Sequence, residues 1–131
     1  SMVWRKTIMN ACMNPVCAVT GMTMAQAIGD PIVFGLIDAL IKEGIAVARA
    51  NEISLGWEYY PYCMQYLKTA GHHKPSMLLD VEARRRTEVD FINGKIVDYG
   101  EQAGIPTPYN RTLRGLVKGL EATTAGQAVR T

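Results

Sequence analysis

Apolar residues recur at spacings of three and four along nearly every segment of this chain, whereas the strict alternation typical of a half-buried strand is absent or short. An α-helix has 3.6 residues per turn, so this spacing places the apolar residues on one helical face. The longest such face begins at Pro31 and persists for about 18 residues. We therefore predict an all-α protein, a helical bundle in which residues 1–131 form a single domain.

Helix start and stop signals divide the chain further. Asp30 followed by Pro31 is typical of a helix N-terminus, because aspartate caps the first turn and proline is favoured at its first position. Pro15 falls inside the first predicted helix, where a kink or an early stop near Asn14 is expected because proline lacks a backbone donor. The predicted helices span about 3–19, 23–27, 31–51, 57–70, 76–81, 87–102 and 108–120, with a polar, frayed tail at 123–131.

Composition and charge exclude several function classes. Apolar residues make up 48% of the chain, charged residues make up 20%, and the mean hydropathy is near zero, as in an ordinary globular domain. The formal net charge of +2 is too small to indicate a nucleic acid or an anionic membrane as partner. The longest apolar stretch is interrupted by Gly35 and Asp38, which makes it too short to span a bilayer.

The cysteines and glycines limit the kinds of binding site expected in this chain. Cys12, Cys17 and Cys63 form an odd set with no CxxC or Cys/His spacing, so we expect no disulfide framework and no metal site. A reducing, cytoplasmic compartment fits them best. The sequence contains neither GxGxxG nor GxxxxGK[ST], so the chain alone is expected to hold no dinucleotide cofactor.

A row of polar residues marks the first predicted helix. Lys6, Asn10 and Asn14 are four residues apart, and neighbours at this spacing share one face of a helix. Two interpretations stay open: a solvated stripe, or a hydrogen-bonded network or cleft wall. Pro15 favours the second, because it leaves a backbone carbonyl beside the row free to accept a hydrogen bond.

A second polar group lies within 15 residues and has two interpretations as well. Its members are Ser76, Asp80, Arg84, Arg85, Arg86, Thr87, Glu88 and Asp90. Charged runs of this kind are usually solvated faces, and acidic residues near a helix start interact favourably with the helix dipole. The alternative interpretation is that this group has a functional role.

Six short motifs, in chain order, resemble the C-terminal domain of ketopantoate reductase (2-dehydropantoate 2-reductase). The resemblance covers residues 3 to about 120. The motifs are Trp4-Arg5-Lys6, Asn10, Asn14-Pro15, Lys74-Pro75-Ser76-Met77 with Asp80, Arg86-Thr87-Glu88-Val89-Asp90 with Ile92-Asn93-Gly94-Lys95-Ile96, and Gly104-Ile105-Pro106-Thr107-Pro108 with Asn110.

The resemblance implies a helical domain of the 6-phosphogluconate dehydrogenase C-terminal type. In the family this domain follows an N-terminal Rossmann domain, absent from this chain, that binds NADPH. The complete enzyme reduces ketopantoate, or a similar small 2-keto acid, to pantoate on the route to pantothenate and coenzyme A. The chain alone is therefore expected to be inactive, and its expected partners are the substrate, the Rossmann domain and a second copy in a homodimer.

The resemblance also implies roles for six residues. Hydride transfer to a ketone leaves an alkoxide, which needs a proton and a nearby positive charge, and an ammonium group supplies both. In this assignment the catalytic residues are Lys6 and Glu88, the substrate-binding residues are Asn10, Asn14 and Ser76, and Asp80 has a supporting role.

The chain departs from the family pattern at two places. The family often has a glycine near Arg84 or Arg85, and another at the end of the long helix, where this chain has Asn51 and Glu52. The local backbone or the substrate fit is expected to differ there. Three alternatives remain: a noncatalytic, dimerising interaction module; a paralogue that reduces another 2-keto acid; and a related dehydrogenase of opines, sugar phosphates or 3-hydroxy acids.

Overall fold

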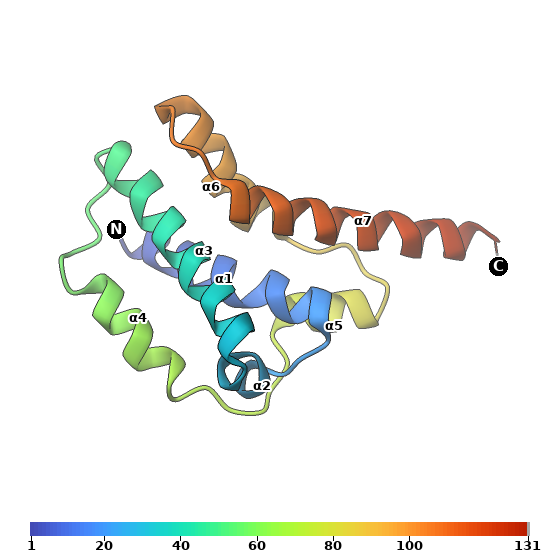
Figure 1. Cartoon of the computed structure of the whole chain (residues 1–131). Coiled ribbons are helices and arrows are strands. Elements are labelled where there is room, and N and C mark those ends of the chain that lie inside the picture. The colour runs from blue at the N-terminus through green and yellow to red at the C-terminus, as the bar shows by residue number, and fades with distance from the viewer. Residues whose placement is uncertain (131) are drawn as a thin grey trace.

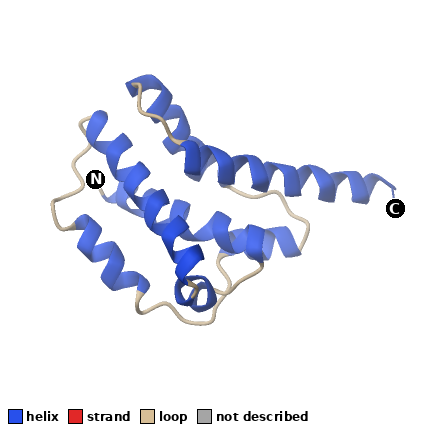
Figure 2. Cartoon of the chain, in the orientation of Figure 1, coloured by secondary structure: helices blue, strands red, loops and turns tan. Residues whose placement is uncertain are grey.

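The computed structural model describes the backbone of residues 1–130 and the side chains of residues 1–123. Within this part of the chain the regular secondary structure is entirely helical (Figure 2). The helices are α1 (Met2–Thr20), α2 (Met24–Gly29), α3 (Pro31–Ala50), α4 (Tyr59–Leu67), α5 (Ser76–Glu82), α6 (Val89–Ala103) and α7 (Pro108–Arg130). The prediction of an all-α domain is confirmed.

Helix α1 is the centre of the bundle. It packs against α3, α5, α6 and α7, and its side chains Ile8, Ala11 and Cys12 are fully buried. Helices α6 and α7 also pack against each other, and the second half of α7 projects beyond the other helices (Figure 1). Because α1 carries the predicted polar row, the fold places that row among several neighbouring helices.

The helix start predicted at Asp30 and Pro31 is confirmed. Asp30 Oδ1 accepts hydrogen bonds from the backbone amides of Ile32 (2.9 Å) and Val33 (3.0 Å), and Pro31 occupies the first position of α3. Gly104 ends α6 in the left-handed conformation, with φ at 71°. These two ends are fixed by neighbours in the sequence, so they are readable without knowledge of the tertiary fold.

Pro15 does not stop α1 near Asn14; the helix continues to Thr20. The alternative of an early stop was therefore wrong. Proline cannot donate to the carbonyl four residues before it, which here is that of Ala11. That carbonyl instead accepts a hydrogen bond from Asn93 Nδ2 of α6 (3.1 Å). A side chain from another helix thus supplies the donor that Pro15 lacks.

Two helices differ in length from the prediction. Helix α4 covers only Tyr59–Leu67, because the residues on either side form turns and Trp57 is exposed rather than part of the buried face. Helix α7 continues to Arg130 instead of ending near Leu120. Its last residues are mostly alanine, threonine, glutamine and arginine without proline, and alanine, glutamine and arginine are good helix formers.

A buried amide pair ties four helices together. Asn93 Nδ2 donates to Asn110 Oδ1 (2.9 Å) as well as to the carbonyl of Ala11, which joins α6 to α7 and α1. Asn110 Nδ2 donates to Glu43 Oε1 of α3 (2.8 Å). The Glu43 carboxylate also accepts from the backbone amides of Tyr109 and Asn110 and so caps the start of α7.

Both departures from the family pattern coincide with unusual backbone geometry, which gives a stability prediction. Glu52 and Arg84 each have φ at 58°, the left-handed conformation that side chains with a Cβ disfavour. Glu52→Gly and Arg84→Gly are each expected to raise the free energy of unfolding by about 0.5 to 1 kcal/mol, because relief of this strain outweighs the added entropy of glycine. Urea denaturation would measure the change.

The neighbouring residue provides a matched control. Ala83 has φ at −86°, where glycine relieves no strain, so Ala83→Gly should lower the free energy of unfolding. A loss of stability in Arg84→Gly as large as that in Ala83→Gly would contradict the assignment of strain to Arg84.

Candidate active site

Lys6 and Asn10 line a pocket between α1 and α4. The pocket has a volume of about 600 Å³, and its remaining lining residues are Met2, Arg5, Met9, Tyr59, Tyr62 and Tyr66. Lys6 is exposed and Asn10 is half-buried. A cation and an amide therefore lie at the edge of a hollow whose other walls are largely aromatic and apolar.

The third member of the row lies deeper in the bundle. Asn14 is 8% exposed, so the row passes from solvent at Lys6, through Asn10, into the interior. Within the described residues, the side-chain hydrogen bonds of α1 are made by other residues, namely Arg5, Thr7, Cys12 and Thr20. This gradient of burial differs from a uniformly solvated stripe and favours a cleft wall with amides available to a ligand.

Ser76 and Asp80 lie on α5, which packs against α1. Pro75 occupies the cap position of α5, and Ser76 is the first residue of the helix and is exposed. Asp80 Oδ1 accepts a hydrogen bond from Arg85 Nε (3.2 Å), and the Asp80 carbonyl accepts one from the Arg85 amide (2.7 Å). Asp80 therefore holds the chain between α5 and α6.

Glu88 occupies the position just before α6, and its carboxylate is exposed. It makes no capping hydrogen bond. Instead, Thr87 Oγ1 accepts from the Val89 amide (3.2 Å). The Glu88 carboxylate is left available for another partner.

The structure brings the predicted site residues together only in part. Lys6 and Asn10 share one pocket, whereas Asn14, Ser76 and Glu88 lie outside its lining. Among the ion pairs of the described residues, none joins Lys6 to Glu88. Helices α5 and α6 nevertheless both pack against α1, so Ser76, on α5, and Glu88, just before α6, belong to segments next to the helix that carries the polar row.

An aromatic wall beside Lys6 was missed by the sequence analysis. Tyr59, Tyr62 and Tyr66 stack along α4, with ring centroids 6.3 and 6.2 Å apart. The Arg5 guanidinium lies 5.0 Å from the ring centroids of both Tyr59 and Tyr62 and 3.2 Å from Glu58 Oε1. The spacing of three and four between these tyrosines was the available signal, but it also fits an ordinary core face.

The three cysteines are free thiols buried in the bundle. Burial raises the pKa of the Cys12 thiol and raises the pKa of Cys17 to about 11, so both thiols are protonated and unreactive at neutral pH. Within the described residues there is no cluster of three His, Cys, Asp or Glu that could bind a metal ion. No described helix has both the length and the apolar character needed to cross a membrane.

Solved structures with the same fold include reductases and dehydrogenases. The chain matches a PanE/ApbA family ketopantoate reductase from Ralstonia eutropha JMP134 with a TM-score of 0.87 and 30% identity, covering 93% of this chain and 41% of that one. It also matches D-mandelate dehydrogenase in complex with NADH and anilino(oxo)acetate, with a TM-score of 0.85 and 30% identity, over 95% and 52% of the two chains. The fold is therefore one that such oxidoreductases use.

Sequence comparison identifies the family. Residues 1–121 match the family described as "Ketopantoate reductase PanE/ApbA C terminal". The 2-dehydropantoate 2-reductase of Streptococcus pyogenes serotype M3 is 37% identical over 122 residues, which are 92% of this chain and 40% of that enzyme. This chain belongs to the ketopantoate reductase C-terminal domain family, and it spans about two fifths of the length of the curated relative.

Proposed function

We propose that this chain is the substrate-binding and catalytic domain of an NADPH-dependent 2-dehydropantoate 2-reductase. Joined to an N-terminal Rossmann domain, it would reduce ketopantoate to pantoate for pantothenate and coenzyme A synthesis in the cytoplasm. The polar row of α1 is the observation that carries the proposal, because it leads from an exposed ammonium to a buried amide. Membership of the ketopantoate reductase family supports it.

We expect NADPH to be held by the N-terminal Rossmann domain rather than by this chain. The described residues form no strand and the sequence has no glycine-rich phosphate loop, the two features by which a Rossmann domain holds a dinucleotide. NADPH, when bound by the Rossmann domain, supplies the hydride. Met2 and Val3 beside Lys6, and Phe91 after Glu88, are exposed apolar residues suited to contact with that domain.

Lys6 acts on the substrate oxygen in this proposal. As the hydride reaches C2 of the keto acid, the carbonyl electron pair moves to its oxygen, and Lys6 Nζ donates a proton to that oxygen. The neutral amine then regains a proton from solvent. Until transfer is complete, the ammonium charge stabilises the developing negative charge on oxygen.

The remaining residues bind and orient. Asn10, Asn14 and Ser76 supply neutral hydrogen-bond donors suited to the carboxylate and hydroxyl groups of the substrate. Glu88 either pairs with Lys6 and orients it or accepts a hydrogen bond from a substrate hydroxyl. Asp80, through Arg85, keeps the connection between α5 and α6 in place.

A fusion protein would test the proposal. Residues 1–131 would be joined behind the N-terminal segment of the Streptococcus pyogenes relative, the part that this chain does not match. We expect the fusion to oxidise NADPH when ketopantoate is added, and the chain and the N-terminal segment alone to be inactive. A folded fusion that binds NADPH but reduces only a different 2-keto acid, such as benzoylformate, would overturn the substrate assignment.

A further inference from the structure

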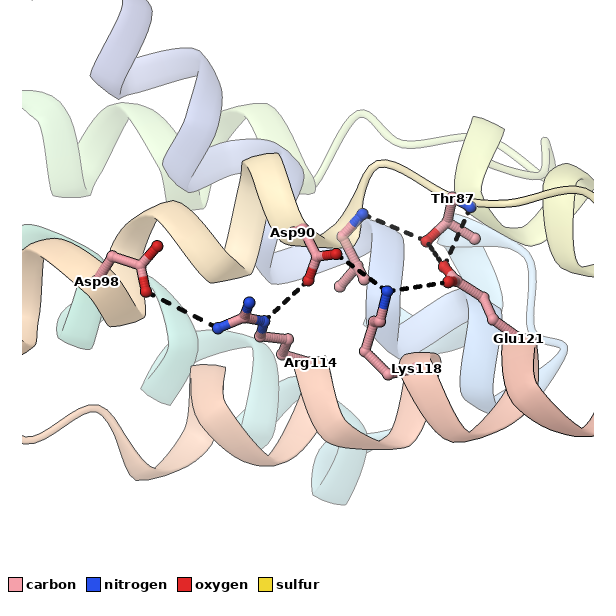
Figure 3. A network of polar contacts seen from close by, with 7 residues as sticks. Thr87, Asp90, Asp98, Arg114, Lys118 and Glu121 are labelled. Carbon is pink, nitrogen blue, oxygen red and sulfur yellow. Dashed lines mark hydrogen bonds and ion pairs between the residues drawn. The ribbon is translucent and has the colours of Figure 1, made fainter.

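A carboxylate on α7 holds the residue that precedes Glu88. Glu121 Oε2 accepts two hydrogen bonds from Thr87, one from the hydroxyl (2.6 Å) and one from the backbone amide (3.1 Å) (Figure 3). Thr87 is buried, and the side chain of Glu121 is only 13% exposed. The contact joins residues 34 positions apart in the sequence.

This contact fixes the backbone on both sides of Glu88. The Thr87 hydroxyl donates to Glu121 and at the same time accepts from the amide of Val89 (3.2 Å). The amides before and after Glu88 are therefore both anchored, one directly and one through the hydroxyl. Thr87 accepts from the first amide of α6, while the carboxylate of Glu88 makes no capping hydrogen bond and stays exposed.

Glu121 is itself held in place by Lys118, a cation of α7 that also binds Asp90. Lys118 Nζ lies 3.3 Å from Glu121 Oε1 and 3.0 Å from Asp90 Oδ2, and Arg114 Nε lies 3.0 Å from Asp90 Oδ1 (Figure 3). Burial raises the pKa of Glu121, but hydrogen bonds from Thr87 and Lys118 outweigh it, so the pKa lies below its usual value. Glu121 is thus ionised at neutral pH and accepts strongly from Thr87.

We propose that Glu121 is a positioning residue for the active site, which acts through Thr87 to hold Glu88 at a fixed place with a free carboxylate. The inference rests on the proposed function for the role of Glu88. The contact between Glu121 and Thr87 could instead only stabilise the fold, without any effect on Glu88. Two experiments distinguish this structural role from a positioning role.

The first experiment follows amide hydrogen exchange in the 131-residue chain. Glu121→Ala should speed exchange at the amides of Thr87 and Val89 by about tenfold or more, because both lose their anchor. Glu121→Gln keeps an acceptor for Thr87 and should restore most of the protection. Asp98→Asn removes an ion pair between α6 and α7, in which Asp98 Oδ1 lies 3.8 Å from Arg114 Nη1, and serves as the matched control with no change at these two amides. Unchanged exchange at Thr87 and Val89 in Glu121→Ala would overturn the proposal.

The second experiment measures turnover in the fusion protein. Glu121→Ala should lower kcat by about tenfold with a smaller change in KM, and Glu121→Gln should recover most of it. In a Glu88→Gln background, Glu121→Ala should have little further effect, because the residue it positions is already disabled. Equal losses in both backgrounds would indicate a merely structural role. If Glu88→Gln leaves kcat unchanged while Glu121→Ala alters amide exchange at Thr87 and Val89, the catalytic role of Glu88 in the proposed function is refuted instead.

Discussion

Lys6→Ala in the fusion protein is expected to lower kcat for ketopantoate by about 100-fold or more, because a positioned general acid contributes that much to a reaction rate. The variant loses both the proton donor and the charge that stabilises the developing alkoxide. Lys6 is exposed at the edge of its pocket, so its removal should leave the fold intact. Steady-state kinetics at saturating NADPH would measure kcat and KM separately.

Lys68→Ala is the matched control for this prediction. Lys68 is also an exposed lysine, but it lies at the end of α4 and outside the pocket lining. Its removal should leave kcat unchanged. If Lys6→Ala reduces kcat no more than Lys68→Ala does, Lys6 has no part in proton transfer.

Asn93→Ala is expected to lower the free energy of unfolding by about 3 kcal/mol. The substitution removes the donor to the Ala11 carbonyl and to Asn110 Oδ1, and each unpaired buried acceptor costs about 1 to 3 kcal/mol. Asn93 Oδ1 has no partner among the described residues, so loss of that atom offsets part of the cost. Guanidinium denaturation followed by circular dichroism would measure the effect.

Pro15 provides a sharper test of the same contact. In Pro15→Ala the helix regains an amide that donates to the Ala11 carbonyl, so this carbonyl no longer depends on Asn93. In that background Asn93→Ala should cost about 1 kcal/mol less than in the parent chain. An equal cost in both backgrounds would show that Asn93 does not compensate for Pro15.

The helices could be predicted from sequence because their signals are local. The apolar period and caps such as Asp30 and Gly104 act within a few residues. The apolar spacing predicts a first helix over about 3–19, but local signals could not decide whether Pro15 ends it early. The continuation of α1 through Pro15 is accompanied by a hydrogen bond from Asn93, a residue 82 positions away in the sequence, to the Ala11 carbonyl.

Only part of the candidate site could be predicted from the sequence. The spacing of Lys6, Asn10 and Asn14 predicts a polar row on one helix, and the family resemblance names the same residues. Periodicity does not reveal which helix faces that row, so the tyrosines of α4 remained part of an ordinary apolar face. The contact between Glu121 and Thr87 joins α7 to the segment before α6, residues 34 positions apart, and the sequence around Glu121 carries no local sign of it.

A crystal structure of the fusion protein with NADP⁺ and pantoate would test most directly whether Lys6 acts on the substrate oxygen. The account predicts that Lys6 Nζ lies about 2.7 to 3.2 Å from the hydroxyl oxygen at C2 of pantoate, within hydrogen-bond distance. Pantoate bound in a closed, ordered site with that oxygen facing another side chain, and with Lys6 directed away from it, would contradict the account.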